Sequence, residues 1–220
     1  MRALALFLRC AAGALALTLS ACGQSDAPST QSVASTAVEA ALPAGCLIGA
    51  NEAIGGPISL IDHTGGAVTQ ENFHEAPTLI YFGFTYCPDI CPLTLQAEKA
   101  TLARLGQQGQ VIQTVLVTLD PARDTPEKLA AYVSSKAFPD GLLGLTGSPE
   151  QIDAAAKAFK VAYSKEEDPK SSADYTIAHS SFLYLMDENW RLVAMYPSTL
   201  SPDEAATCLK AAMKTEDNPT

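Results

Sequence analysis

Two cysteines four positions apart carry the side chains in this chain that are most able to do chemistry. Cys87 and Cys91 lie in the run YCPDICP (86–92), which follows a short apolar segment. If a helix begins within this run, its N-terminal end favours the Cys87 thiolate, and both sulfurs face the same side. Two thiolates in one loop form a soft site that suits Cu(I). By composition alone, a structural disulfide or a redox-active Cys87–Cys91 dithiol is an equal alternative.

A histidine would complete a metal site, and the chain has three of them, His63, His74 and His179. His63 lies in an expected hairpin turn and His74 in a polar loop, so we expect both to be solvated. His179 precedes an expected strand, in a segment (173–196) without the proline that thioredoxin-type oxidoreductases place there. The two cysteines with His179 would fit three-coordinate Cu(I), and would accept Cu(II) with an added water or carboxylate.

The elements that must position these residues alternate between strands and helices. A buried strand is expected over 77–85, a largely covered helix over 88–105 with Glu98 interrupting its apolar face, and a central strand over 111–119. The other expected elements are a hairpin over 56–68, helices from Thr125, over 148–159 and from 201 to about 213, a short apolar piece at 142–145, and paired strands over 181–186 and 191–196. This order predicts an α/β, thioredoxin-like fold with an extra N-terminal β-hairpin, in which the segment holding His179 lies beside the cysteine loop.

Composition excludes several functional classes. The chain of 220 residues has 14 Lys and Arg against 24 Asp and Glu, a formal net charge of −10. This acidity argues against a nucleic-acid-binding protein, whose phosphate contacts need a basic face. With 47% hydrophobic and 17% charged residues, the chain is not a disordered polar protein. No run reaches the roughly 20 apolar residues of a membrane-spanning helix.

The first 21 residues have the features of a bacterial export signal. Arg2 and Arg9 accompany an apolar stretch, and LSAC (19–22) resembles the lipobox of bacterial lipoproteins. By this resemblance Cys22 becomes the lipidated first residue of a protein that is anchored to a membrane of the bacterial cell envelope and faces the periplasm or exterior. The alternative is a plain secretory signal with Cys22 as an incidental thiol.

We expect four consecutive segments: a lipoprotein signal peptide at 1–21, a flexible tether at 22–45, the thioredoxin-like domain at 46–214 and a C-terminal tail at 215–220. The tether is rich in Ser, Thr, Ala and Pro and contains no aromatic residue. Such a segment buries too little apolar surface to offset its ordering entropy. It would hold the domain away from the membrane.

The remaining cysteines include a candidate structural disulfide. Of six cysteines, Cys10 lies in the signal and Cys22 is assigned to lipid, which leaves four cysteines and three possible pairings. With the two cysteines of the 86–92 run set aside, Cys46 and Cys208 form the other pair, which would join the start of the domain to its last helix. The alternative, two unpaired thiols, is awkward in an oxidising compartment.

Three separated blocks resemble the Sco/SenC copper chaperones of cytochrome oxidase assembly. They are FGFTYCPDICP (82–92), TLDPARDTP (118–126) and His179 with the strand after it, and the resemblance covers about residues 55–213. It implies that the two cysteines and His179 bind copper, and that the protein delivers this copper to the binuclear copper centre of cytochrome c oxidase subunit II. Other copper carriers would be further partners.

The resemblance also leaves a second function open. Some family members reduce the cysteines of the oxidase subunit, so the alternative is a thiol-disulfide oxidoreductase acting on those cysteines or on other envelope proteins. In that reaction Cys87 would attack and Cys91 would resolve the mixed disulfide. Many family members carry an acid immediately before the ligand histidine, whereas Ala178 takes that place here, which puts an outer carboxylate in doubt.

Two further alternatives explain less of the sequence. A peroxiredoxin-like peroxidase would use Cys87 as its reactive thiolate, but a resolving cysteine four residues away on the same helix is atypical. An inert structural module does not explain why Cys, Pro and His gather at one loop edge.

Several neighbours of the motif have two interpretations. Asp120, Arg123 and Asp124 follow the central strand. They would either dock a partner or support the metal ligands from close by, or they would form a solvated turn with its own ion pair. Phe84 and Tyr86, beside the cysteines, are expected to pack and shield the site rather than react.

Overall fold

The computed structural model describes residues 41–49, 53–167 and 174–216, which belong to the compact unit Ala40–Thr220. The expected signal peptide, the expected lipidation site Cys22, most of the expected tether and most of the expected C-terminal tail lie outside the described residues. Among the helices within these ranges, none has the length and apolar character needed to span a membrane.

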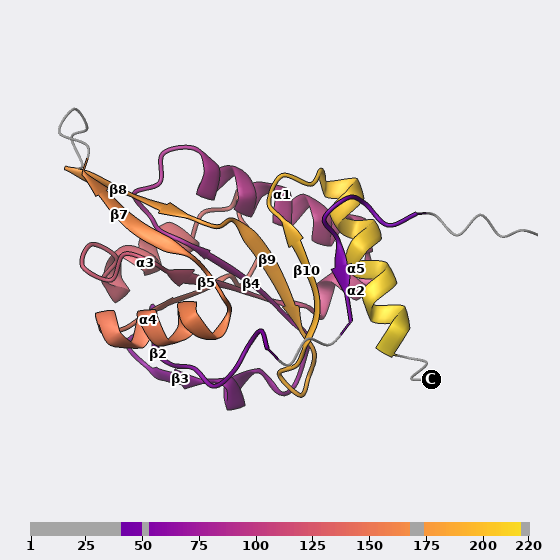
Figure 1. Ribbon diagram of the computed structural model, residues 1–220, viewed down its shortest axis with the longest axis horizontal. Helices are drawn as coiled ribbons and strands as arrows, with labels where there is room; N and C mark the ends of the chain where they lie inside the picture. Colours follow the sequence, from indigo (N-terminus) through magenta and orange to yellow (C-terminus); the bar gives the residue numbers. More distant parts are fainter. Residues whose placement is uncertain (1–40, 50–52, 168–173, 217–220) are drawn as a thin grey trace, which may run out of the picture. The chain divides into compact units, whose positions relative to one another are not determined.

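Each expected helix and strand is present, with bounds that differ by up to three residues, and further elements occur beside them. The strands are β1 (Leu47–Ile48), β2 (Ser59–Asp62), β3 (Ala67–Thr69), β4 (Thr78–Gly83), β5 (Gln113–Thr118), β6 (Leu143–Thr146), β7 (Tyr163–Glu167), β8 (Tyr175–His179), β9 (Phe182–Met186) and β10 (Leu192–Pro197). The helices are α1 (Ile90–Leu105), α2 (Gln107–Gln110), α3 (Pro126–Val133), α4 (Pro149–Ala158) and α5 (Pro202–Glu216), with a short 3-10 helix at Gln70–Phe73. Figure 1 shows their arrangement.

Eight of the described strands form one sheet in the order β1-β10-β9-β4-β5-β6-β2-β3. β4, β5 and β6 run parallel and are connected through α1 and α3, whereas β9 lies antiparallel to β4 and β10 antiparallel to β9. This parallel unit, followed by an antiparallel hairpin and a helix, is the order expected of a thioredoxin-like fold. The N-terminal hairpin of β2 and β3 pairs with β6 through β2 and so extends the same sheet.

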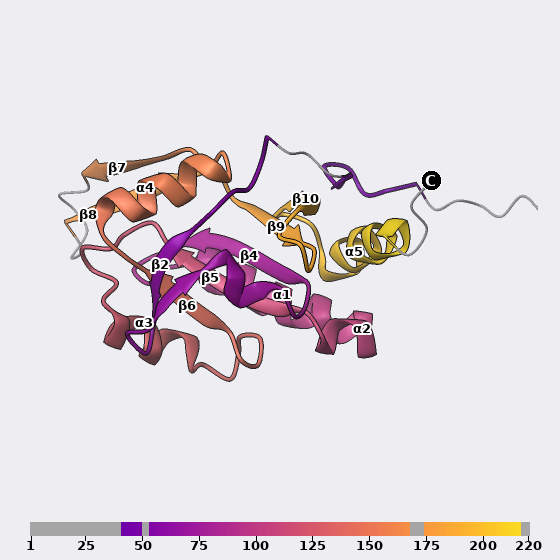
Figure 2. The ribbon, with the colours of Figure 1, turned by 90° about the horizontal axis from the view of Figure 1, so that it is seen from below.

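The central strand β4 is buried along its whole length, and its alternating side chains separate the two faces of the sheet. Tyr81 points to α1, where its hydroxyl lies 3.6 Å from the Cys91 sulfur. Phe82 points to the other face and packs against Phe159 at the end of α4, with 5.3 Å between ring centroids. Therefore α1 covers one face and α4 the opposite one, as Figure 2 shows, and α5 packs beside α1.

Two helices begin where the local sequence predicts. The Thr125 side chain accepts a hydrogen bond from the Lys128 backbone N–H at the start of α3. Ser148 and Gln151 form a reciprocal capping box at the start of α4. In both helices a proline occupies the first helical position, where its missing N–H costs no hydrogen bond.

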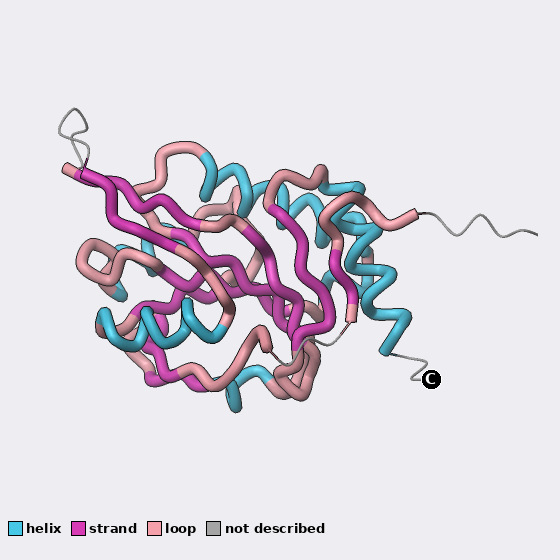
Figure 3. The backbone as a smooth tube through the Cα atoms, viewed as in Figure 1, coloured by secondary structure: helices cyan, strands magenta, loops and turns pink. Residues whose placement is uncertain are grey.

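The ribbon formed by β7 and β8 is an element that the sequence pattern does not predict. Its strands pair antiparallel, with Tyr163 opposite His179 and Glu167 opposite Tyr175, and both are visible as strands in Figure 3. The sequence of β7, YSKEE, is exposed except at Tyr163, so it lacks the apolar alternation that indicates a strand. His179 consequently lies at the end of a strand, which corrects its expected place in a loop.

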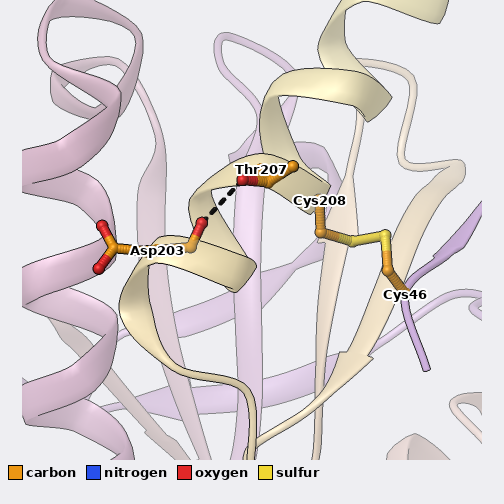
Figure 4. The surroundings of a disulfide bond; sticks show 4 residues. All are labelled: Cys46, Asp203, Thr207 and Cys208. Atoms are coloured by element: carbon orange, nitrogen blue, oxygen red, sulfur yellow. Dashed lines mark hydrogen bonds between the residues drawn. A yellow bond between two sulfur atoms is a disulfide. The ribbon is translucent and has the colours of Figure 1, made fainter. Parts of the chain in front are cut away.

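A disulfide bond joins Cys46 to Cys208 across 162 residues of sequence. Figure 4 shows Cys208 projecting from α5 toward the segment that carries Cys46, while Thr207 of the same helix donates its hydroxyl hydrogen to the Asp203 carbonyl. Cys208 is fully buried and Cys46 is nearly so. The bond links the segment before β1 to the last helix, and it is the pairing that cysteine counting indicates.

Candidate metal centre

The cysteine loop joins the end of β4 to the start of α1. Cys87 lies in this loop and is half-buried, whereas Cys91 lies in the first turn of α1 and is fully buried. Both are free thiols, and the Cys91 backbone N–H donates a hydrogen bond to the Cys87 sulfur across 3.3 Å. The N-terminal end of α1 therefore faces the Cys87 sulfur.

Gly83, the last residue of β4, permits the close approach of Cys91 to the strand. A Cβ added at this position would lie 3.1 Å from the Cys91 sulfur and 2.9 Å from Cε1 of Tyr81. Both distances are shorter than ordinary carbon contacts, so a larger residue would push α1 away from β4. The glycine thus allows the buried sulfur to sit directly against the sheet.

The two cysteines differ in acidity. The pKa of Cys87 is lowered to about 6, chiefly by a hydrogen bond from the Cys91 side chain and, against the opposing effect of burial, by the backbone N–H groups at the helix start. The pKa of Cys91 is raised well above its ordinary value by the same bond to Cys87 and by burial. At neutral pH Cys87 is therefore the thiolate and Cys91 the thiol.

His179 lies at the end of β8 and faces the buried cysteine. Its Nε2 atom is 4.0 Å from the Cys91 sulfur, and its Nδ1 atom is 3.0 Å from the Ser180 carbonyl oxygen. Because a carbonyl oxygen only accepts, this bond places the proton on Nδ1 and leaves the Nε2 lone pair free toward Cys91. The ring is held in the tautomer that a metal ligand needs.

A cavity of about 400 Å³ opens between the cysteine loop and β8. Cys87, Pro88 and Ile90 line it on the loop side, and Thr176 and His179 line it on the strand side. Within the described ranges no group of three or more His, Cys, Asp or Glu is already arranged to hold a metal ion. The fold thus brings Cys87 and His179 to the same cavity. The Cys87 sulfur accepts a hydrogen bond from the Cys91 N–H there.

Asp124 supports the cysteine loop through hydrogen bonds from Thr85. It is fully buried and accepts hydrogen bonds from the Thr85 backbone N–H at 3.0 Å and from the Thr118 hydroxyl at 2.6 Å. The Thr85 hydroxyl donates to the same carboxylate. Asp124 therefore ties the loop to the end of β5. The acids of this turn are buried rather than solvated, although the ion pair expected within it is present.

Asp120 and Arg123 form an ion pair that is also largely buried. The Tyr175 hydroxyl donates to Asp120 across 2.8 Å, and the Arg123 guanidinium donates to the Tyr175 carbonyl across 3.1 Å. The pair thus connects the turn after β5 to β8, on the strand that carries His179.

The other two histidines lie away from the cysteines. His63 lies in the hairpin turn as expected, but it is only partly exposed, because its Nδ1 accepts the Gly144 backbone N–H. His74 is exposed and contacts the Glu188 carbonyl and Glu71, as expected of a loop residue.

Sequence reasoning missed two contributors to the site. Tyr81 is part of the buried strand, and its hydroxyl contacts both the Cys91 sulfur and the Ser181 hydroxyl. Tyr175 lies on the unpredicted ribbon. A tyrosine within the otherwise apolar run TLIYFG was the available signal for Tyr81, because a buried hydroxyl requires a hydrogen-bond partner.

Known proteins are similar to this chain in sequence. A model of the SCO1/SenC family matches residues 48–214. The chain is 40% identical over 159 residues to Protein sco1 of Schizosaccharomyces pombe, a match that covers 71% of this chain and 59% of that protein. It is 36% identical over 171 residues to Protein SenC of Rhodobacter capsulatus, covering 76% of this chain and 75% of that protein. The chain thus spans less than two thirds of the fission-yeast relative.

The solved structures include a close match in fold. The crystal structure of Arabidopsis thaliana ScoI with copper bound aligns with a TM-score of 0.67 and 37% identity, and covers 74% of this chain and 99% of that one. The fold and the site together define a thioredoxin-like α/β protein with a dithiol at the start of its first helix, as predicted. The chain belongs to the SCO1/SenC family, which confirms the resemblance seen in the sequence.

Proposed function

We propose that this protein is a copper-binding metallochaperone that delivers copper to the binuclear copper centre of cytochrome c oxidase subunit II during assembly of the respiratory complex. The observation that carries the proposal is the 4.0 Å contact between His179 Nε2 and the Cys91 sulfur, at a cavity that Cys87 also lines. The likeness to the plant protein solved with copper supports it.

The proposed ligands of the transported copper are Cys87, Cys91 and His179. Two thiolates and an imidazole suit Cu(I), and with an added ligand they also suit Cu(II). Cys91 releases its proton when it binds the metal, because only the thiolate is a ligand. Since Cys87 is the more exposed sulfur, we expect a cysteine of the partner to displace it first, and the other ligands to exchange in later steps.

The test is a titration of Cu(I) against a competing chelator, with the full chain reduced, anaerobic and in detergent. We expect one tightly held Cu(I) per chain, and binding weakened by about tenfold or more in His179→Ala because one of three ligands is lost. His74→Ala is the matched control and should bind as the wild type does. Equal affinity in wild type and His179→Ala would remove His179 from the site, and no binding by the wild type would reject the chaperone.

A second function, thiol-disulfide oxidoreductase, is supported by the acidity of Cys87 and the burial of Cys91. The Cys87 thiolate would attack an oxidised partner and form a mixed disulfide, releasing one partner thiolate. Cys91 would then attack the Cys87 sulfur, releasing the second partner thiolate and leaving a Cys87–Cys91 disulfide, so that two electrons pass to the partner. Cys91→Ser should trap the mixed disulfide with an oxidised subunit II peptide, whereas Cys87→Ser should not.

We also propose that the domain is tethered to a membrane of the cell envelope through a lipid on Cys22, with the signal peptide at 1–21, the tether at 22–45, the domain at 46–214 and the tail at 215–220. The lipobox-like LSAC run supports this. Cys22→Ser should move the protein from the membrane fraction to the soluble fraction. Retention of that variant in the membrane fraction would contradict the anchor.

A further inference from the structure

The ribbon of β7 and β8 lies outside the main sheet, packs on the core through Ile177 and is hydrogen-bonded to the domain at its base. Among the described residues β8 pairs only with β7 and lies outside the eight-stranded sheet. At its base the Ser180 N–H donates to the Ala162 carbonyl across 2.9 Å, and β9 begins two residues later. Ladder bonds to the main sheet therefore do not determine how closely His179 approaches the cysteine loop.

Arg123 provides a second attachment at the other end of β8. Its guanidinium carbon lies 3.7 Å from the centroid of the Tyr175 ring and 4.5 Å from that of the Tyr86 ring. Tyr86 immediately precedes Cys87, and Tyr175 is four residues before His179 on β8, about 13 Å along the strand. The guanidinium thus packs between the loop of one ligand and the strand of another.

The contacts of Arg123 define its position closely. Its side chain is only 14% exposed and is paired with Asp120, which is itself 4% exposed. Asp120 accepts the Tyr175 hydroxyl and Arg123 donates to the Tyr175 carbonyl. A planar guanidinium makes stacking contacts and directed hydrogen bonds at once, which an ammonium group cannot reproduce.

We propose that Arg123 is a positioning residue for the metal site. It holds the ribbon of β7 and β8 against the cysteine loop, and so sets the distance of His179 from Cys87 and Cys91. This inference rests on the proposed copper-binding function. Without the contacts of Arg123, the end of the ribbon at Tyr175 would be released from the cysteine loop, and the strand that carries Thr176 and His179 would be freer to move from the cysteines.

Two neighbouring lysines offer matched controls, because each contacts one of the two rings. Lys128 Nζ lies 5.2 Å from the Tyr86 centroid and Lys165 Nζ lies 3.8 Å from the Tyr175 centroid. Of these three cations, only Arg123 contacts both rings. Lys128→Met and Lys165→Met each remove a positive charge near the site while leaving the contacts of Arg123 with both rings intact.

The experiment measures Cu(I) affinity of the full chain in detergent by chelator competition, with and without the second change His179→Ala. We expect Arg123→Met to weaken Cu(I) binding by about tenfold in the wild-type background and to have no effect in the His179→Ala background, because the two changes act through the same ligand. Arg123→Lys should give an intermediate loss, and the two lysine variants should bind as the wild type does.

A second measurement without copper separates this inference from the proposed function. In the reduced, metal-free protein, Arg123→Met should speed amide hydrogen exchange in β7 and β8 while leaving β4 and β5 protected. Unchanged amide exchange in the ribbon would overturn the positioning role of Arg123 even if copper binds. Equal weakening of Cu(I) binding in both backgrounds would also overturn it, since Arg123 would then act on the cysteines or on the whole fold. Failure of the wild type to bind Cu(I) would reject the proposed function. The exchange data would still decide whether Arg123 holds the ribbon against the cysteine loop.

Discussion

Cys87 and Cys91 have the same side chain, but their surroundings give them opposite roles. Cys87 receives a hydrogen bond from the Cys91 N–H and is half-buried, whereas Cys91 is packed beneath it against β4. The acidity of a thiol depends on which donors reach it and on its distance from water. At the scale of the residue, Cys87 is therefore the more accessible and more acidic thiol, which is ready to react or bind, and Cys91 is the buried and less acidic one.

We expect the alkylation of Cys87 by iodoacetamide to follow its lowered pKa of about 6. Only the thiolate reacts, so the rate should be nearly constant above pH 7 and about tenfold lower at pH 5. Removing the main cause of the shift with Cys91→Ala should move the midpoint upward toward that of an ordinary cysteine. Mass spectrometry of the labelled peptide measures both. A wild-type midpoint near that of an ordinary cysteine would contradict the assignment.

At the scale of the element, the turn after β5 supports the cysteine loop through Asp124. Asp124→Ala removes the acceptor of the buried Thr118 hydroxyl and of the Thr85 N–H. We expect the free energy of unfolding to fall by about 2–4 kcal/mol, because each stranded donor costs roughly 1–3 kcal/mol. Urea unfolding of the reduced protein measures this. The control Asp140→Ala removes an exposed ion pair with Lys99 and should cost less than about 1 kcal/mol.

Helix α1 carries an acid inside the core. Glu98 is 2% exposed, and among the described residues neither of its carboxyl oxygens has a hydrogen-bond partner. Burial raises its pKa well above the ordinary value, and the pKa of Tyr196 is raised by burial and by the neighbouring Glu98. Glu98 thus interrupts the apolar face of the helix, as the sequence indicates, and its carboxyl group lies buried in the core.

The raised pKa of Glu98 predicts a loss of stability with rising pH. The native state holds the proton more tightly than the unfolded chain, in which a glutamate has a pKa of about 4.3, so stability falls as pH rises above that value. Glu98→Leu should remove this dependence and stabilise the protein by about 1–3 kcal/mol at pH 8. Urea unfolding at pH 5 and pH 8 measures it. The control Gln96→Leu, at an exposed site of the same helix, should change neither value, and a pH-independent difference for Glu98→Leu would contradict the account.

At the scale of the whole molecule, the Cys46–Cys208 bond joins the two ends of the described domain. It closes a loop of 162 residues, so the chain-entropy model assigns it about 5 kcal/mol through the restriction of the unfolded chain. We expect the Cys46→Ala, Cys208→Ala double variant to lose several kcal/mol in urea unfolding. Thr207→Ala, which removes the exposed hydroxyl bond seen beside the disulfide (Figure 4), should lose less than about 0.5 kcal/mol. A loss below about 1 kcal/mol in the double variant would show that residual structure already restricts the unfolded chain.

The residues proposed as ligands and much of the fold can be predicted from the sequence because their signals are local. The run TLIYFG is apolar enough to predict the buried strand β4, and Thr125 and Ser148 cap α3 and α4 through residues three positions away. Such interactions need no knowledge of the rest of the chain. The sequence did not predict the ribbon of β7 and β8, because its polar strand β7 is stabilised by pairing with β8 rather than by its own pattern.

The sequence by itself determined the chemistry available, namely two thiols four residues apart, one histidine before a strand, and an order of elements that brings them to one edge. Only the tertiary structure decided how that chemistry is expressed. It brought His179 within 4.0 Å of the Cys91 sulfur across 88 residues of chain, made Cys87 the thiolate, and packed Arg123 between two rings from separate segments. These properties depend on burial and on contacts between residues distant in sequence, and the folded chain is what sets both.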